Sequence, residues 1–160
     1  MKQKVVSVVE KTKVLIVDNG VLNRKALTDA VNISGLAAVE HAASTGEHAL
    51  DRLRQKPYDL VLLNILLDET PELKTLRVIR QQFPTVVVWM TGTKADFALR
   101  GVPVMALGVA GFLYRQADLT AEAELKSLVR QFVVLHERYA AKRRWEVAAS
   151  GNSFAATGAG

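Results

Sequence analysis

The stretch Tyr58-Asp59-Leu60-Val61-Leu62-Leu63-Asn64 is a short, mostly apolar run that ends in one polar side chain. Because apolar and polar residues do not alternate along it, the run is typical of a strand buried on both faces of a parallel sheet. Open parallel sheets bind their ligands at the carboxyl ends of the strands. We therefore expect Asn64, which ends this strand, to lie at a functional site.

Other apolar runs of the chain also end in polar residues. The predicted strands and the polar residues at their ends are 13–17 with Asp18 and Asn19, 36–42, 58–64 with Asn64, 85–90 with Thr91, and 111–114 with Arg115. The segments between these runs carry apolar residues at helical spacing, so strands and helices are predicted to alternate. The first helix illustrates the pattern with Leu22, Ala26, Ala30 and Ile33. Gly101 and Pro103 interrupt the segment 94–107, where we expect a short helix or two helical pieces.

Strands that alternate with helices predict right-handed crossovers and a parallel sheet with helices on both faces. Five strands of this size predict a flavodoxin-like, doubly wound α/β fold with the strand order 2-1-3-4-5. This order would gather the polar strand ends into one pocket. Its members would be Asp18, Asn19, Asn64, Thr91 and Arg115.

The length of 160 residues predicts one domain that is large enough to bury a core. We expect a leader over residues 1–11, a folded domain over residues 12–140 and a tail over residues 141–160. The tail begins with Lys142-Arg143-Arg144 and continues into small residues, so we expect it to be basic and then flexible.

The composition excludes several kinds of site. The chain has no Cys, which excludes disulfides and thiolate metal ligands, and its three His lack metal-ligand spacing. No apolar run approaches the roughly 18 residues that a membrane helix requires, and no secretory signal follows the N-terminus. We therefore expect a cytoplasmic protein without a membrane contact. The net charge of +5 permits an acidic partner without requiring one.

From about Lys13 to about Tyr139, the chain resembles the receiver domain of bacterial two-component response regulators. The resemblance rests on strings that occur in register: Val14-Leu15-Ile16-Val17-Asp18-Asn19, Arg24, Pro57-Tyr58-Asp59-Leu60-Val61-Leu62-Leu63-Asn64, Thr91, and Gly108-Val109-Ala110-Gly111-Phe112-Leu113-Tyr114-Arg115. At these positions the family has an acidic pair, a phospho-accepting aspartate, a switch Thr or Ser, and a switch aromatic residue followed by a lysine.

The chain departs from this family pattern where the family performs its chemistry. The acidic pair is Asp18-Asn19, the acceptor position is Asn64 and the lysine position is Arg115. One carboxylate of three would hold Mg²⁺ poorly, and an amide cannot form an acyl phosphate. Arginine does not replace lysine where one compact charge is needed. We therefore expect a degenerate pseudo-receiver with no catalytic residue, metal or cofactor, in which Arg115 pairs with Asp18 in place of the metal.

The resemblance implies a signalling surface built from the fourth helix, fifth strand and fifth helix. We expect a phosphorylation-independent module, not an enzyme, whose partners are proteins of a signalling pathway, with a homodimer as an option. The last helix has a stripe with nearly heptad spacing that could pack on the sheet and then extend into a dimer contact. The candidate interaction residues are Phe112, Leu125, Leu128, Phe132, Leu135 and Tyr139.

Other interpretations of the same residues stay open. The chain could be a receiver that is still regulated by phosphorylation or a ligand at an atypical site, such as Asp68. It could also be a nucleic-acid-associated regulator that uses its basic C-terminal end, although no recognition helix supports this function. The polar residues also have structural interpretations, in which Asp18-Asn19-Gly20 is a turn and helix cap, Asn64 satisfies backbone groups and Phe112 belongs to the core.

Overall fold

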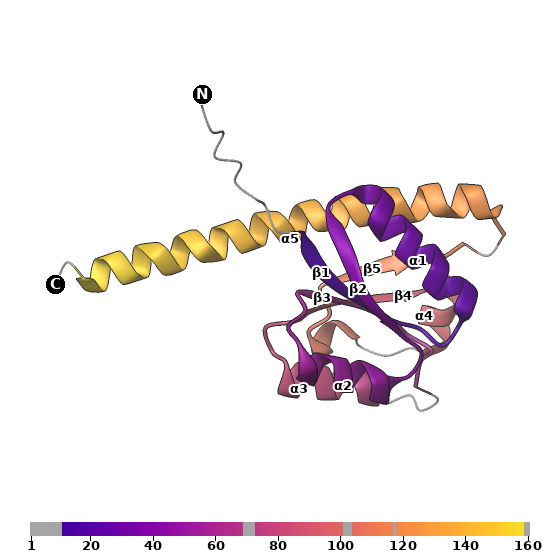
Figure 1. The fold of residues 1–160 in the computed structure, drawn as a ribbon, viewed down its shortest axis with the longest axis horizontal. Coiled ribbons are helices and arrows are strands. Elements are labelled where there is room, and N and C mark those ends of the chain that lie inside the picture. The colour runs from indigo at the N-terminus through magenta and orange to yellow at the C-terminus, as the bar shows by residue number, and fades with distance from the viewer. Residues whose placement is uncertain (1–10, 69–72, 101–103, 117, 159–160) are drawn as a thin grey trace, which may run out of the picture.

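The computed structural model describes residues 11–68, 73–100, 104–116 and 118–158. Strands and helices alternate along this part of the chain (Figure 1). The strands are β1 (Thr12–Val17), β2 (Ala37–Ala43), β3 (Leu60–Asn64), β4 (Val87–Gly92) and β5 (Gly111–Tyr114). The helices are α1 (Val21–Ser34), α2 (Gly46–Gln55), α3 (Lys74–Gln82), α4 (Lys94–Arg100), the 3₁₀ helix η1 (Val104–Leu107) and α5 (Ala121–Gly158).

The five strands form one parallel sheet in the order β2-β1-β3-β4-β5. The predicted flavodoxin-like order is therefore confirmed, and each strand begins and ends within two residues of its predicted range. In this order β1 and β3 are neighbours, and β4 lies on the other side of β3. The carboxyl ends of three central strands consequently lie side by side.

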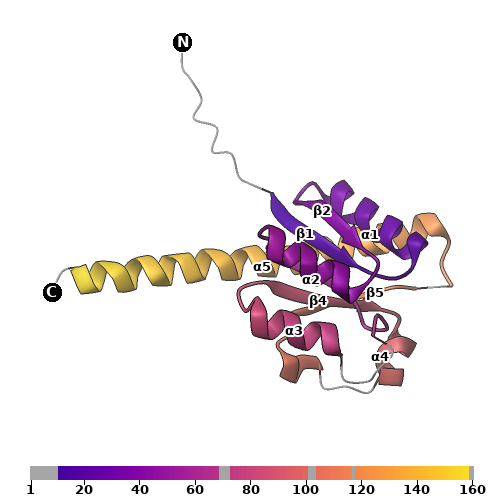
Figure 2. The same cartoon turned by 60° about the horizontal axis from the view of Figure 1, so that its bottom comes forward.

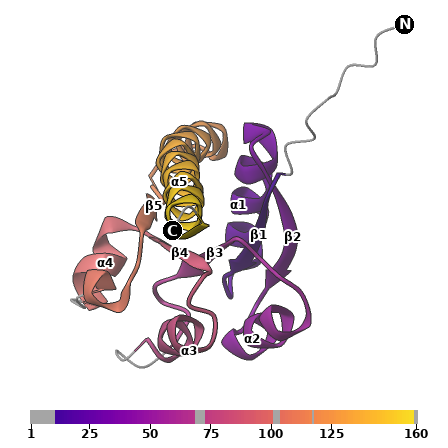
Figure 3. The same ribbon diagram turned by 90° about the vertical axis from the view of Figure 1, so that its left-hand side faces the viewer.

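Helices cover both faces of the sheet. Viewed end-on, α1 and α5 lie on one face, α2 and α3 lie on the other, and α4 flanks β5 at the edge (Figure 3). Each face has its own apolar core, because successive residues of a strand point to opposite sides. Trp89 and Phe132 lie at the centre of the core beneath α1 and α5, with their rings edge-to-face at 5.4 Å.

The buried stripe of α1 agrees with the predicted stripe at Ala26 and Ala30 and differs from it at Leu22 and Ile33. Leu22 and Ile33 are 78% and 59% exposed, whereas Leu27, Ala30 and Val31 are buried. Both sets repeat every three or four residues, so the spacing alone does not show which stripe faces the sheet. Packing against the sheet and α5 selects the second stripe.

The helices on the opposite face are held by local polar contacts. Thr45 caps α2, because its Oγ1 accepts a hydrogen bond from the N–H of His48 at 3.2 Å. Asp68 accepts hydrogen bonds from both the backbone N–H and the Oγ1 of Thr75, at 2.8 and 2.9 Å. Asp68 thus fastens the chain after β3 to the start of α3.

The segment after β4 forms two helical pieces, α4 and η1, as predicted from its interruption. Gly101 and Pro103 themselves lie outside the described residues.

Helix α5 corrects the prediction of a flexible tail. It runs without interruption over 38 residues from Ala121 to Gly158 and continues well past the sheet (Figures 1 and 2). No proline interrupts residues 141–158, and alanine, the residue with the strongest helix propensity, is frequent among them. Small residues were interpreted as flexible, whereas alanine favours a helix. Residues 1–10 of the predicted leader lie outside the described part of the chain.

Candidate functional site

Asp18 and Asn64 meet at the carboxyl ends of the neighbouring strands β1 and β3. The Asp18 carboxylate is fully buried and Asn64 is 7% exposed. The Nδ2 of Asn64 donates a hydrogen bond to Oδ2 of Asp18 at 2.8 Å. The predicted convergence of these two residues is therefore present as a direct contact between their side chains.

The remaining polar atoms of this pair are also bonded. Oδ1 of Asp18 accepts hydrogen bonds from the N–H of Gly20 at 2.8 Å and from Nδ2 of Asn23 at 3.3 Å. Oδ1 of Asn64 accepts one from the N–H of Leu66 at 2.7 Å, which fixes the orientation of the amide and directs its NH₂ group to Asp18. The interpretation of Asn64 as an amide that satisfies a backbone group is thus realised. Asp18 closes a turn with the N–H of Gly20, but α1 begins after Gly20 without a side-chain cap.

These residues do not fit a divalent cation. Magnesium prefers several anionic oxygens in octahedral geometry, but each Asp18 carboxylate oxygen faces N–H donors. In the parts of the chain that the structure describes, no group of three or more His, Cys, Asp or Glu side chains is placed to hold a metal. A cation at Asp18 would have to displace the Asn64 amide from the carboxylate.

Thr91 and Asn19 lie near this pair in different environments. Thr91 is the β4 neighbour of Asn64 in the sheet and is fully buried. Its carbonyl accepts a hydrogen bond from Ile65 at 2.9 Å, but its Oγ1 has no hydrogen-bond partner among the described residues. Asn19 is exposed. The buried part of the predicted pocket is therefore formed by Asp18, Asn64 and Thr91.

Arg115 does not pair with Asp18, so that prediction is wrong. Its Nε donates instead to Oε1 of Glu124 in the first turn of α5 at 3.1 Å, and the two side chains are only 20% and 14% exposed. The carboxylate of Asp18 is already bonded to neutral donors, whereas Glu124 offers a free charge beside the end of β5. Arg115 thereby lines a hollow of about 520 Å³ between α1 and α5, together with Leu22 and Lys25.

The predicted interaction stripe on the last helix is a core stripe. Leu128 and Phe132 are 0% and 1% exposed, and Leu125, Leu135 and Tyr139 pack against the same core. Phe112 packs in the core on the opposite side of the sheet. Heptad-like spacing therefore marks the side of α5 that faces the sheet, and the six residues do not form one exposed surface.

Phe112 instead belongs to an aromatic cluster between α4 and β5. Phe97 of α4 contacts the rings of Phe112 and Tyr114 edge-to-face, at 5.3 and 5.4 Å. Leu99 of α4, by contrast, is 79% exposed. Helix α4 thus carries one ring that packs against β5 and one apolar side chain that is exposed to solvent.

Sequence reasoning missed three residues that shape these contacts: Asn23, Glu124 and Gln131. Gln131 of α5 accepts from the N–H of Tyr114 at 2.8 Å and donates to its carbonyl at 2.9 Å, so it fastens α5 to the edge strand. A signal was present for Asn23, which falls in the first turn of the helix that follows Asp18. Glu124 and Gln131 make contacts across elements, which the sequence does not indicate.

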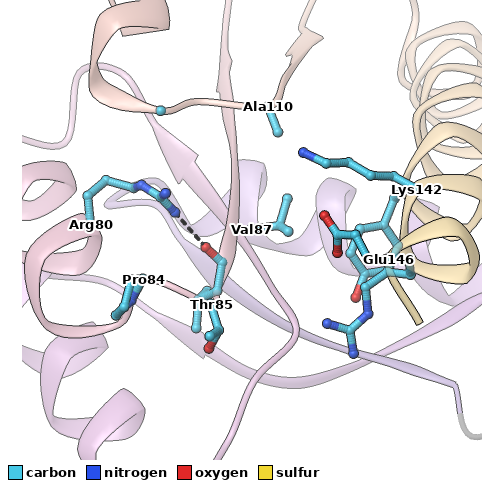
Figure 4. A pocket seen from close by; sticks show the side chains of 11 residues that line it. Arg80, Pro84, Thr85, Val87, Ala110, Lys142 and Glu146 are labelled. Carbon is cyan, nitrogen blue, oxygen red and sulfur yellow. Dashed lines mark hydrogen bonds between the residues drawn. The ribbon is translucent and has the colours of Figure 1, made fainter. Parts of the chain in front are cut away.

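A second hollow lies at the opposite, amino end of β4 and β5. Its volume is about 280 Å³, and Lys142 and Glu146 of α5 face Val87, Ala110 and Arg80 across it (Figure 4). Arg80 donates a hydrogen bond to the carbonyl of Val86 at 2.8 Å. Its guanidinium is therefore engaged in holding the start of β4.

No helix in the described ranges is both long enough and apolar enough to span a membrane.

Comparisons with known proteins find relatives that match part of this chain. The protein-glutamate methylesterase/protein-glutamine glutaminase 2 of Methanosarcina mazei is 40% identical over 86 residues, which cover 52% of this chain and 23% of that protein. The corresponding protein of Archaeoglobus fulgidus is 28% identical over 121 residues, covering 76% of this chain and 34% of the relative. The chain thus matches 23% and 34% of the lengths of these two relatives.

Solved structures show the same fold. The response regulator domain of Thermotoga maritima CheB superposes with a TM-score of 0.61 at 18% identity, covering 76% of this chain and 92% of that one. The REC domain of AraT, a response regulator from Geobacillus stearothermophilus, gives a TM-score of 0.64 at 18% identity, covering 84% and 99%. The family model described as response regulator receiver domain matches residues 14–129. The chain therefore belongs to the response regulator receiver domain family.

Proposed function

We propose that this chain is a receiver-type signalling module that works without phosphorylation at the Asn64 position. The observation that carries the proposal is the 2.8 Å hydrogen bond from the Asn64 amide to the buried Asp18 carboxylate. It places an amide, which is no nucleophile for phosphoryl transfer, at the strand end. The same bond uses the carboxylate that a divalent ion would need.

The contacts of Arg115 support this function, because its positive charge is paired within the fold and is not directed towards the end of β3. A phosphoryl group at the end of β3 would need a positive charge directed towards it. The guanidinium of Arg115 is instead engaged by Glu124 of α5. The contact ties the end of β5 to α5, so Arg115 stabilises the fold in a module that has no phosphate to bind.

We further propose that a protein partner contacts the face formed by α4, β5 and α5. Among the residues of this face whose exposure the structure describes, Leu99 is the most exposed large apolar one, and Lys94 lies with its Nζ 6.0 Å from the ring centre of Tyr114. Helix α4 and strand β5 thus offer an exposed apolar side chain and a surface cation, and protein interfaces combine groups of both kinds. Partner recognition at this face needs no chemistry at Asn64.

The phosphorylation part of the proposal is tested by intact-mass measurement after incubation with a small acyl phosphate and Mg²⁺. We expect no gain of a phosphoryl group, while an active receiver domain in the same reaction gains one. A phosphoryl group on the chain that persists in Asn64→Ala and disappears in Asp68→Asn would instead support the alternative of an atypical acceptor. The structure disfavours that alternative, because both Asp68 carboxylate oxygens bond to Thr75.

The interaction part is tested with two surface variants. Leu99→Glu alters the α4–β5–α5 face, whereas Val147→Glu alters an equally exposed apolar residue on the far part of α5. We expect proteins that co-purify with the wild-type chain to be lost with Leu99→Glu and kept with Val147→Glu. The reverse pattern would place the partner elsewhere.

A further inference from the structure

The outward side of α5 carries large apolar side chains that the described part of the chain leaves uncovered. Val134 is 49% exposed, Trp145 is 71% exposed, and every residue from 141 to 150 is exposed. The helix continues away from the sheet with no other element beside it (Figures 1 and 2). Helices without tertiary packing are only marginally stable in water, so a contact along this side would stabilise the extension.

Residues on the outward side of α5 occur at equal distances in sequence before and after Val134. Ala141 and Trp145 follow Val134 by seven and eleven residues, so the three lie on one stripe. Ser127 and Ala123 precede Val134 by the same seven and eleven residues. A twofold axis at Val134 would therefore place Ala141 opposite Ser127 and Trp145 opposite Ala123. The large indole would meet a small side chain at each end, which suits close packing.

The charges of α5 favour the antiparallel orientation. In the first turn, Glu124 is engaged by Arg115, whereas Glu122 is exposed and contacts Lys126 at 3.4 Å. The basic run Lys142-Arg143-Arg144 lies about six turns later. In a parallel pair the basic cluster would face its own copy, but in an antiparallel pair it lies towards the end of α5 that carries Glu122. Like charges that face each other are destabilising and opposite charges favour association.

A second charge relation supports the same axis. Arg130 and Glu137 lie one turn before and one turn after Val134, on the exposed side of α5. A twofold rotation about Val134 brings Arg130 of one helix beside Glu137 of the other, so the dimer would contain two such pairs. The symmetry of the charges thus matches the symmetry of the apolar stripe.

We propose that two copies of this chain associate through an antiparallel α5–α5 contact centred on Val134, with Trp145 of each copy packed over Ala123 of the other. The contact from residue 123 to residue 145 would be about 33 Å long. It uses the side of α5 that points away from the sheet and leaves Leu99 on α4 free. The inference is independent of whether Asn64 can be phosphorylated.

Cysteine cross-linking tests the orientation, because the natural chain contains no Cys. Chains carrying Ser127→Cys and chains carrying Ala141→Cys are prepared separately and then mixed under oxidising conditions. We expect a disulfide-linked heterodimer in the mixture and little cross-linking of either variant alone. Strong self-linking of Ala141→Cys would show a parallel pair, and an absence of cross-links in all samples would show that this contact does not form; both results overturn the proposal.

Sedimentation equilibrium tests the residues of the contact. We expect Val134→Glu and Trp145→Ala each to raise the dimer dissociation constant roughly tenfold or more, because Val134 lies at the centre of the contact and Trp145 is its largest side chain. Far-ultraviolet circular dichroism checks that the domain stays folded. The reversed pair Arg130→Glu with Glu137→Arg should restore dimerisation that either single change weakens.

Leu99→Glu is the matched control, since it alters an exposed apolar residue outside the proposed contact. It should leave the dissociation constant unchanged while altering partner binding at the α4–β5–α5 face. A wild-type chain that is monomeric at all concentrations would overturn the inference. So would a dimer that Leu99→Glu dissociates and Val134→Glu does not.

Discussion

The carboxyl end of the sheet buries a charged side chain, whereas the outer half of α5 exposes a large apolar one. Around Asp18, both carboxylate oxygens are buried and bonded to donors of the same chain. Around Trp145, the indole is 71% exposed. Asp18 and Asn64, which occupy positions where the family pattern has chemistry, are bonded to each other within the fold, whereas exposed apolar side chains lie on α5.

The largest expected effect separates the two sides of α5. Phe132→Ala should lower the free energy of unfolding by about 3–5 kcal/mol, because the ring is buried against Trp89 beneath α5. Val134→Ala changes a half-exposed residue two positions away and should cost less than about 0.5 kcal/mol at concentrations where the chain is monomeric. Urea denaturation of both variants gives the difference. Equal losses would mean that the inner and outer sides of α5 are not distinct.

The next effect concerns the strand-end pair. Asn64→Ala should lower the free energy of unfolding by about 1–3 kcal/mol, because it leaves Oδ2 of Asp18 buried without its donor. Asn19→Ala, at the exposed neighbouring position, should be nearly neutral. A neutral Asn64→Ala, measured by the same urea denaturation, would show that the hydrogen bond does not stabilise the fold.

A smaller effect is expected at the ion pair between Arg115 and Glu124, which forms instead of the predicted pair between Arg115 and Asp18. A double-mutant cycle with Arg115→Ala and Glu124→Ala should give a coupling energy of up to about 1 kcal/mol, since this pair is well shielded but not fully buried. A cycle with Arg115→Ala and Asp18→Asn serves as the control and should give no coupling.

The smallest effect is a pH dependence that arises at His136. Burial lowers the pKa of His136 below 6.5, and one ring nitrogen, Nε2, lies 2.8 Å from Oγ1 of Thr12. The unfolded chain therefore binds a proton at a pH where the folded chain does not, so the free energy of unfolding should fall as the pH drops below about 6.5. The fall should level off once the pH is below the pKa of the folded state.

His136→Gln isolates this contribution. Burial also lowers the pKa of His41, which gives a slope of the same sign. Unfolding measured between pH 5 and 8 should therefore show a reduced slope in the variant, not a flat line. An unchanged slope would mean that His136 does not titrate differently in the folded and unfolded states.

The sheet was predictable because each of its signals is local. A buried strand such as β3 is a continuous apolar run, and alternation with helical segments leaves few possible topologies. The convergence of Asp18 and Asn64 followed directly from that order. These predictions needed only the identity and spacing of nearby residues.

The predictions were wrong where one sequence pattern is compatible with two structures and tertiary contacts determine which of them forms. Arg115 could reach either Asp18 or Glu124, and only the structure shows that Asp18 is already bonded. The stripe that contains Phe132 has the spacing of either a core face or a dimer face, and burial identifies it as core. The length of α5 was missed because its small residues were interpreted as flexible, although alanine favours helices.

The most direct test of the account is a titration of the chain with Mg²⁺, followed through the backbone amide resonances of Gly20 and Leu66. These two N–H groups bond to the side chains of Asp18 and Asn64, so they report any change in the pair. We expect no saturable shift at millimolar Mg²⁺, because the Asn64 amide holds the carboxylate that the ion would need. A saturable shift of both resonances, which reverses with a chelator, would show that Mg²⁺ displaces Asn64 from Asp18. This result would contradict the proposed phosphorylation-independent function.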